Sequence, residues 1–332
     1  MAERLGAFLS TLDPERPVIV QTHDYPDIDA VASAWALAEL LRREGRKASC
    51  AYRGEMRSRS LRKLVEELGI AIGTETVAGS RPQVVVVDGS PGNGNVALME
   101  GDLTAIIDHH RPTGAARAPF VDSRPGLSAC STMIRGYWEE AGAAPPRPVA
   151  TALLAGIQSD TDFLSRRVSD EDFAAYASLY REGDWELACR VVRTVLDLRE
   201  LRLVAAALAA AEARDGLLFA FIDEPCGQEA LAVLAEFAIR AEDLAAAVVA
   251  EAEEGGTHLS ARSKTSALSA FGLVREALAG IGTGGGHEHA AGGVVPAASR
   301  AGPRAIRDRF FAAAEAARAK VESEHVPDHE ES

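Results

Sequence analysis

Three short apolar runs in the first half of the chain each lead into acidic residues or histidines. The runs are PVIVQT (17–22), QVVVVDG (83–89) and LTAIIDHH (103–110). Their apolar residues are continuous rather than alternating, which predicts strands buried on both faces, as in a parallel sheet covered by helices. Apolar residues at helical spacing follow from Ala30 onward, and PVATALLAGIQSDT (148–161) predicts a helix or buried segment. This alternation of strands and helices favours a doubly wound α/β fold.

In an open parallel sheet, ligands bind outside the carboxyl ends of the strands. The polar clusters stand where these segments end, so we expect four separate stretches of chain to converge on one crevice. Carboxylates and imidazoles are the ligands that Mn²⁺ accepts, and a two-metal site needs a bridging carboxylate. Four carboxylates would balance the charge of two divalent ions. The candidate ligands are His23, Asp27, Asp29, Asp88, His109 and Asp160.

The second half of the chain changes character. A densely helical stretch near 174–214 is followed by a new series of strand-like and helix-like segments and by GTGGGHEHAAGG (282–293). We therefore expect two domains joined by helices. The predicted boundaries are 1–195 for the metal-binding domain, 196–214 for a helical linker, 215–322 for a smaller α/β substrate-binding domain and 323–332 for a frayed acidic tail.

Composition excludes several classes of protein. Lys and Arg total 35 against 49 Asp and Glu, a net charge of −14, which argues against sequence-independent binding of long duplex nucleic acid. The four widely spaced cysteines form no CxxC pair, which favours a reducing compartment. The N-terminus lacks the pattern of a signal peptide, and the apolar stretches are too short to span a membrane. We therefore expect a cytoplasmic protein without a membrane partner.

The order of the motifs resembles a known family. HDYPDIDA, VVVVDGS, IIDHH and GIQSDT are similar, in order and approximate spacing, to the four motifs of the DHH phosphoesterase superfamily. GGGHEHAAGG resembles the GGGHxxAAG signature of the DHH-associated domain, and LSARS (259–263) is similar to the serine–arginine strand that precedes it. The resemblance covers about residues 15–320.

The resemblance implies a role for each matching residue. The six candidate ligands would hold two manganese ions, with Asp88 as the bridge and with Mg²⁺ or Co²⁺ as substitutes. Asp108 and His110 would act in catalysis: Asp108 orients its neighbours, and His110 faces the substrate phosphate. The substrate-binding residues would be Arg262, Gly284, Gly285, Gly286 and His287.

The implied reaction is attack on phosphorus by a hydroxide that two metal ions activate. Either His110 or a water molecule would protonate the leaving group. The substrate would be a short oligonucleotide or a mononucleotide phosphate, as in the nanoRNase and 3′-phosphoadenosine-5′-phosphate phosphatase branch. Family II inorganic pyrophosphatases share the first four motifs but have a different second domain. A homodimer is expected by analogy.

Two alternatives stay open at this stage. One is a soluble phosphodiesterase for linear or cyclic dinucleotides, and the other is a non-catalytic nucleotide-binding module on the same scaffold. Taken alone, Asp88 also fits an ordinary Asp-Gly turn, and Arg262 a surface arginine. Asp162 stands where many family members have glycine, so it adds a carboxylate next to the fourth motif.

Overall fold

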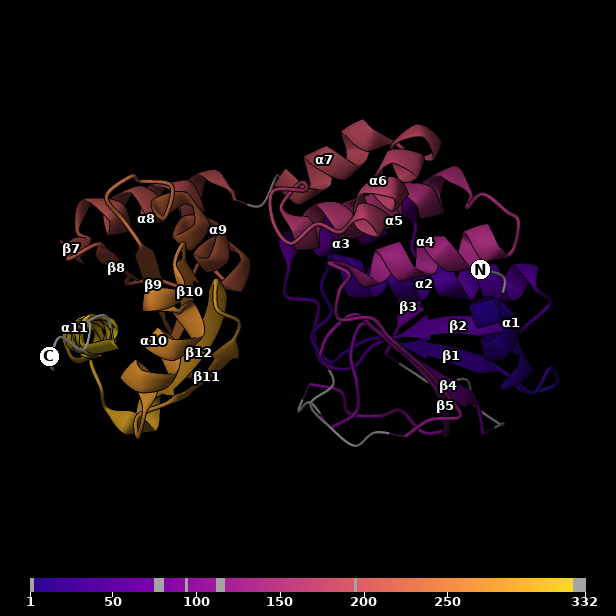
Figure 1. Ribbon diagram of the computed structural model, residues 1–332, viewed down its shortest axis with the longest axis horizontal. Helices are drawn as coiled ribbons and strands as arrows, with labels where there is room; N and C mark the ends of the chain where they lie inside the picture. Colours follow the sequence, from indigo (N-terminus) through magenta and orange to yellow (C-terminus); the bar gives the residue numbers. More distant parts are fainter. Residues whose placement is uncertain (1–2, 75–80, 93–94, 112–116, 194–195, 325–332) are drawn as a thin grey trace, which may run out of the picture. The chain divides into compact units, whose positions relative to one another are not determined.

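The computed structural model describes residues 3–74, 81–92, 95–111, 117–193 and 196–324. The chain divides into two compact units, Met1–Thr194 and Val195–Ser332. Each unit has its own sheet and its own hydrophobic core (Figure 1).

The first unit contains a six-stranded sheet in which every strand runs parallel to its neighbours. The strand order is β3-β2-β1-β4-β5-β6, so the chain winds outward from the centre in both directions. The predicted α/β class with a parallel sheet is therefore confirmed. The strands are β1 (Val18–Gln21), β2 (Ala48–Ala51), β3 (Ile72–Gly73), β4 (Gln83–Val87), β5 (Asp102–Asp108) and β6 (Phe120–Ser123).

Helices cover one face of this sheet. Helices α2, α4 and α5 lie there (Figure 1), and they share a core with the alternate strand residues Val20, Val85 and Ile107. On the opposite face, Val84 and Val86 pack against Val96 from the segment that joins β4 to β5. The helices of this unit are α1 (Glu3–Ser10), α2 (Ile28–Arg43), α3 (Arg59–Leu68), α4 (Cys130–Glu140), α5 (Arg147–Thr161), α6 (Asp170–Glu182) and α7 (Trp185–Arg193).

The register of the central strands aligns the carboxyl ends of β1, β4 and β5, where the polar clusters begin. Gln21 in β1 is paired with Val86 in β4, and Val87 is paired with Ile107 in β5. Each partner therefore stands one or two residues before a candidate ligand of the first three motifs. Because the strands are parallel, those ligands emerge at the same edge of the sheet.

The second unit contains a mixed six-stranded sheet with the order β11-β12-β10-β9-β8-β7. Strands β8 and β9 are parallel, and the other neighbours are antiparallel. Its strands are β7 (Glu212–Arg214), β8 (Leu217–Ile222), β9 (Ala246–Glu253), β10 (Gly256–Ser263), β11 (Thr283–Gly286) and β12 (Ala290–Pro296). Its helices are α8 (Leu198–Ala209), α9 (Gln228–Ala238), α10 (Ala270–Leu278) and α11 (Pro303–Glu324), with 3₁₀ turns η1 (Ser266–Leu268) and η2 (Ala297–Ser299).

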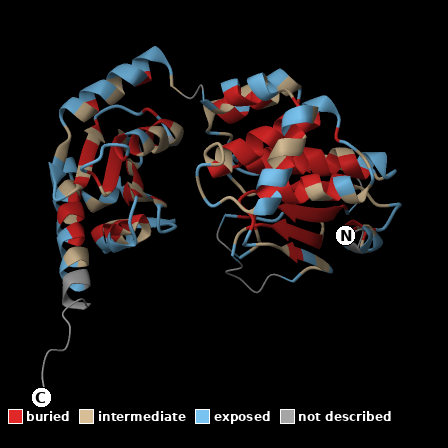
Figure 2. Cartoon of the chain, turned by 45° about the horizontal axis from the view of Figure 1, so that its top comes forward, coloured by how far each residue is buried: buried red, intermediate tan, exposed pale blue. Residues whose placement is uncertain are grey.

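Helices cover both faces of the second sheet. Residues of α8 and α9 pack with Ala220, Ile222 and Val249 on one face, whereas residues of α10 and α11 pack with Phe219 and Val248 on the other. Figure 2 shows the buried strands and inner helix faces of both units in red.

The segment 196–214, predicted as a helical linker, takes part in this second sheet and its core. Helix α8 contributes Ala207 to the hydrophobic cluster, and β7 pairs with β8. At the end of the chain, α11 runs to Glu324, and residues 325–332 of the predicted tail lie outside the described residues. Among the described helices, none is long and apolar enough to cross a membrane.

The glycine-rich strand β11 packs tightly against α10. A methyl group on Gly284 would overlap the Val274 side chain and would lie 2.7 Å from the carbonyl oxygen of Gly292. The next residue, Gly285, has no atom within 4 Å of the corresponding position. The two neighbouring glycines therefore face different surroundings: Gly284 faces the helix, and Gly285 faces open space.

This contrast leads to a stability prediction. Gly284→Ala should lower the free energy of unfolding by about 1–3 kcal/mol, because an added methyl group overpacks the contact between α10 and β11. The matched control Gly285→Ala should change it by less than about 0.5 kcal/mol, as exposed substitutions usually do. Chemical denaturation monitored by circular dichroism measures both values. Equal effects of the two substitutions would contradict the packing role of Gly284.

Candidate metal centre

The six predicted ligands lie together at the carboxyl edge of the first sheet. His23, Asp27 and Asp88 form one group of potential ligand atoms within 4.8 Å of one another, and Asp29, His109 and Asp160 form a second. They come from four segments: the turn after β1 together with the first turn of α2, the end of β4, the end of β5 and the last turn of α5. The structure therefore brings together the residues that the four motifs contain.

Asp88 stands between the two groups. Its Oδ2 lies 3.8 Å from Nε2 of His23, and its Oδ1 lies 3.2 Å from Nε2 of His109. Its backbone φ of 56° is unusual for a residue with a side chain. The backbone amide donates to the carbonyl of Ile107 and so fixes this turn at the end of β4. The two carboxylate oxygens thus face two different histidines, which is the arrangement that a bridging ligand requires.

Two buried atoms at this contact have no hydrogen-bond partner within the described part of the chain. They are Oδ1 of Asp88 and Nε2 of His109. Buried polar atoms are normally satisfied, so an unsatisfied carboxylate oxygen and an unsatisfied imidazole nitrogen that face each other indicate a missing partner. Both atoms are typical ligands of Mn²⁺ and of related divalent ions. The residues of the site therefore fit a metal ion.

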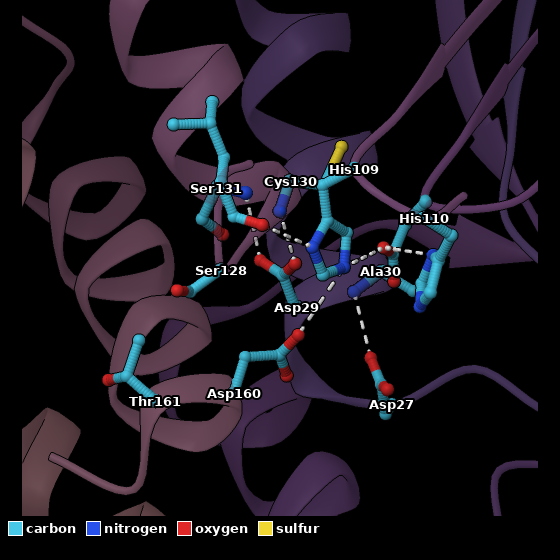
Figure 3. A network of polar contacts seen from close by, with 12 residues as sticks. Asp27, Asp29, Ala30, His109, His110, Ser128, Cys130, Ser131, Asp160 and Thr161 are labelled. Carbon is cyan, nitrogen blue, oxygen red and sulfur yellow. Dashed lines mark hydrogen bonds and ion pairs between the residues drawn. The ribbon is translucent and has the colours of Figure 1, made fainter. Parts of the chain in front are cut away.

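Asp29 is fully buried and is held by the start of helix α4 (Figure 3). Its Oδ2 accepts a hydrogen bond of 2.6 Å from the backbone amide of Cys130, and its Oδ1 accepts one of 2.9 Å from that of Ser131. Ala129, the N-cap residue, provides no side-chain cap. The carboxylate of Asp29 therefore satisfies the first amides of α4, where the helix dipole favours negative charge.

Gly156 in α5 makes room for this contact. A methyl group there would overlap the hydroxyl group of Ser131 and would lie 2.7 Å from Oδ1 of Asp29. Glycine is unfavourable inside a helix, so its presence here has a packing reason. Sequence reasoning missed both Gly156 and Ser131, and the only local signal was a glycine in the middle of the predicted helix 148–161.

The imidazole of His109 is oriented by a backbone carbonyl. Its Nδ1 lies 3.2 Å from the carbonyl oxygen of Leu127, so Nδ1 donates a proton to this carbonyl and Nε2 is directed at the site, where a cation could replace its proton. The next residue, Ser128, donates its backbone amide to both carboxylate oxygens of the buried Asp172. Asp172 also accepts from Thr132 in α4 and completes a capping box with Ser169. Asp172 thereby holds the loop that orients His109.

The imidazole of His110 is held by Asp108. Its Nδ1 lies 2.8 Å from Oδ1 of Asp108, and the same oxygen accepts the backbone amide of His110. His110 is about two-fifths exposed, whereas Asp108 is buried. The pKa of His110 is raised by the hydrogen bond to Asp108. Because Nδ1 is engaged by Asp108, Nε2 is the ring nitrogen of His110 that is left for another partner.

The charges of the cluster shift the pKa values of its members. Burial opposes the charged form of His109, but Asp88 outweighs burial and raises the pKa of His109 to about 10. In the same way, Asp27 and Asp88 overcome burial and raise the pKa of His23 to about 9. Burial and repulsion by Asp88 raise the pKa of Asp29 to about 7, and burial and repulsion by Asp29 raise that of Asp160 well above its usual range. Protons and cations therefore compete for these ligand atoms.

Asp162, the residue that departs from the family pattern, ends helix α5 as its C-cap. Its φ is 46°, in the left-handed region that favours glycine and that aspartate tolerates. Its Oδ2 accepts from the hydroxyl group of Ser165 at 3.2 Å. The backbone conformation explains why glycine suits this position, and the carboxylate is used by the local turn.

The predicted substrate residues lie in the second unit. Arg262 in β10 is mostly buried; its Nε donates to Glu236 of α9 at 2.9 Å, and its Nη1 donates to the hydroxyl group of Ser260 at 3.0 Å. Gly285 and His287 are exposed. The carbonyl of His287 accepts the amide of Phe271 at the start of α10. The glycines at 284 and 286 make close backbone contacts with β12, so their absence of a side chain has a packing reason as well.

Comparisons with known proteins agree with this architecture. Residues 17–157 match the model of the DHH family, N-terminal domain, and residues 214–319 match that of the DHHA1 domain. An uncharacterized protein from Methanocaldococcus jannaschii is 29% identical over 286 residues, which cover 86% of this chain and 59% of the relative. A probable manganese-dependent inorganic pyrophosphatase from Streptococcus suis is 31% identical over 167 residues, which cover 47% of this chain and 53% of the relative. The chain thus spans little more than half the length of these curated relatives.

A solved structure shares the whole fold. The crystal structure of an exopolyphosphatase-related protein from Bacteroides fragilis matches with a TM-score of 0.74 at 15% sequence identity. The match covers 97% of this chain and 98% of that protein. At this identity, the likeness shows a common fold.

The tight packing around Asp29 predicts an effect of Gly156 on metal binding. Gly156→Ala should weaken Mn²⁺ binding by about 10- to 100-fold, because residues that orient metal ligands have effects of that size. The matched control is Gly136→Ala in α4, where no atom lies within 4 Å of the added methyl group. That control should raise the free energy of unfolding by up to about 1 kcal/mol, the helix preference for alanine, and should bind Mn²⁺ normally. Isothermal titration calorimetry measures both affinities, and normal binding by Gly156→Ala would contradict the role of Gly156.

The pKa shifts predict that metal binding releases protons. His23, His109 and Asp29 have raised pKa values, so they hold protons more strongly than usual as the pH falls, and Mn²⁺ must displace these protons. The apparent affinity should therefore weaken from about pH 8 to about pH 6, by roughly tenfold per pH unit for each proton displaced. Calorimetry in two buffers with different ionisation enthalpies counts the protons. Equal observed heats in both buffers would contradict the prediction.

Proposed function

The chain belongs to the DHH family, and on that premise we propose that it is a manganese-dependent phosphoesterase that hydrolyses short oligonucleotides or mononucleotide phosphates. Under this proposal, residues 1–195 bind the metal ions and residues 215–322 bind the substrate. The proposed ligands of two ions are His23, Asp27, Asp29, Asp88, His109 and Asp160.

One observation carries the proposal. The two oxygens of Asp88 face His23 and His109, and Oδ1 of Asp88 and Nε2 of His109 are buried without a hydrogen-bond partner among the described residues. A purely structural cluster would satisfy these atoms with hydrogen bonds. The name of the Streptococcus suis relative supports manganese as the metal.

When bound, the ions would supply Lewis acidity toward phosphate oxygens and would lower the pKa of water. The side chains of the protein would position the ions and the substrate. Asp88 and Asp29 would hold ligand oxygens in fixed positions, since Asp29 is tied to the start of α4 and Asp88 to β5. Carboxylates fixed in this way would keep the cations in place to stabilise the negative charge that develops on the phosphoryl oxygens.

His110 would donate a proton at Nε2. Its raised pKa, caused first by the hydrogen bond to Asp108, keeps the ring charged to a higher pH than usual. A charged imidazole stabilises negative charge on the phosphoryl oxygens and can protonate the leaving oxygen. We therefore propose His110 as the general acid and Asp108 as the residue that orients it.

The second domain supports a nucleotide substrate. The proposed phosphate ligand Arg262 is held by Glu236 and Ser260, so its guanidinium group has a fixed orientation that suits a phosphate oxygen. His287 is exposed on the loop after β11. Pyrophosphate is the second candidate, because the Streptococcus suis relative is named as a pyrophosphatase.

A substrate panel tests the proposal. The wild-type protein with Mn²⁺ is offered a 5′-phosphorylated dinucleotide, a longer oligonucleotide, 3′-phosphoadenosine 5′-phosphate, a cyclic dinucleotide and pyrophosphate. We expect turnover of the dinucleotide or of 3′-phosphoadenosine 5′-phosphate, and loss of that turnover on chelation of the metal. Asp88→Asn should lower kcat/KM by more than about 100-fold, because even residues that only orient metal ligands have effects of 10- to 100-fold.

The matched control is Asp162→Asn. It makes the same chemical change two residues beyond Asp160, at a left-handed position that asparagine tolerates, and should keep most of the activity. Turnover of pyrophosphate alone would refute the nucleotide substrate in favour of the second candidate. Nucleotide binding without hydrolysis of any substrate would instead identify a non-catalytic binding module.

A further inference from the structure

An exposed aromatic ring stands next to the metal ligands. Tyr25 lies between His23 and Asp27 in the chain, and it is 52% exposed. The guanidinium group of Arg57 lies over its ring at 4.3 Å from the centroid. Exposure alone is not unusual for tyrosine, but a ring that is exposed beside a cluster of candidate ligands and is covered by a guanidinium group can offer a flat surface to a bound molecule.

The backbone that carries this ring is held firmly. The amide of Asp24 donates to the carbonyl of Asn95 at 2.7 Å, and its carboxylate accepts the amide of Ala97 through both oxygens. On the other side, Gly54 packs so closely against the carbonyl of Asp24 that a methyl group there would overlap it. Gly54 also has a φ of 74°, which a side chain disfavours. The ring is therefore presented from a fixed turn rather than from a mobile loop.

The backbone of Tyr25 lies close to the proposed metal ligands. Tyr25 is two residues from each of two proposed ligands, so its Cα lies no more than about 7 Å from theirs. A nucleoside attached to a phosphate at the metals spans a similar distance. Arg57 adds a positive charge beside the ring, and its Nε lies 3.9 Å from the carboxylate of Glu55, a side chain that is 75% exposed. The surroundings therefore suit an anionic ligand that carries a flat aromatic group.

We propose that Tyr25 and Arg57 form a stacking site for a nucleobase of the substrate, on the metal-binding domain itself. The base would stack on the ring and guanidinium pair, and Arg57 would attract the phosphates that flank it. Stacking of a base on an aromatic side chain tolerates any base, so this site would favour nucleotides over pyrophosphate without strong base preference. The inference rests on the proposed function and specifies which substrates fit.

Binding of two matched ligands tests the site. Adenosine 5′-monophosphate, a product of the proposed reaction, and ribose 5-phosphate differ only in the base. Each is titrated by calorimetry into the Mn²⁺-loaded wild-type protein and into Tyr25→Ala. We expect the wild type to bind the nucleotide roughly 5- to 100-fold more tightly than the sugar phosphate, and Tyr25→Ala to lose most of this preference. Tyr25→Trp should keep it.

Tyr180→Ala is the matched control. Tyr180 lies in α6, is 53% exposed, and also contacts an aromatic residue, Trp185. This variant should keep the full preference for the nucleotide. Arg57→Gln should weaken the binding of both ligands and reduce the preference for the base.

The outcomes separate this inference from the proposed function. If Tyr25→Ala weakens both ligands equally, the residue only supports the metal-binding turn, and the stacking site is refuted. If wild type binds both ligands equally, the site is refuted as well, whatever the substrate panel shows. If the base preference depends on Tyr25 but no substrate is hydrolysed, the stacking site stands and the proposed catalytic function fails.

Discussion

The structure of the first domain depends on the repulsion between carboxylates that are buried together. Asp29, Asp88 and Asp160 meet at one edge of the sheet, two of them almost fully inaccessible to solvent. Such a cluster is unfavourable unless positive charge compensates it. The protein supplies part of the compensation through the first amides of α4 and the imidazoles of His23 and His109. Divalent cations would supply the remainder.

This constraint explains features far from the ligands. Helix α4 must begin where Asp29 can cap it, and α5 must approach closely enough to bring Asp160 in, which only a glycine at 156 permits. The loop before α4 must also turn the carbonyl of Leu127 toward His109, and Asp172 in α6 holds that loop. Helices α4, α5 and α6 thus each make a contact that depends on this polar site, in addition to packing through their apolar faces.

Much of this domain could be predicted from its sequence. Continuous apolar strands indicated a parallel sheet, and the polar residues at their ends indicated a site at the carboxyl edge, because strand polarity alone decides where those ends meet. The start of α4, the capping role of Asp29 and the buried Asp172 were missed. Each of these contacts joins residues separated by more than 40 positions, so no local pattern of the chain records it.

The amino-acid sequence by itself determined the class of fold and the placing of carboxylates and imidazoles at the ends of its strands, since these follow from the periodicity of apolar residues and from residue order, and the motifs indicated the family. The tertiary structure decided what each residue contacts. It assigned Asp88 to two histidines, Asp162 to a left-handed helix end and Gly284 to the surface of α10. It also left Tyr25 exposed under Arg57. These contacts join segments that are far apart in the sequence. They form only when the chain is folded, because close packing in the interior decides which side chains meet.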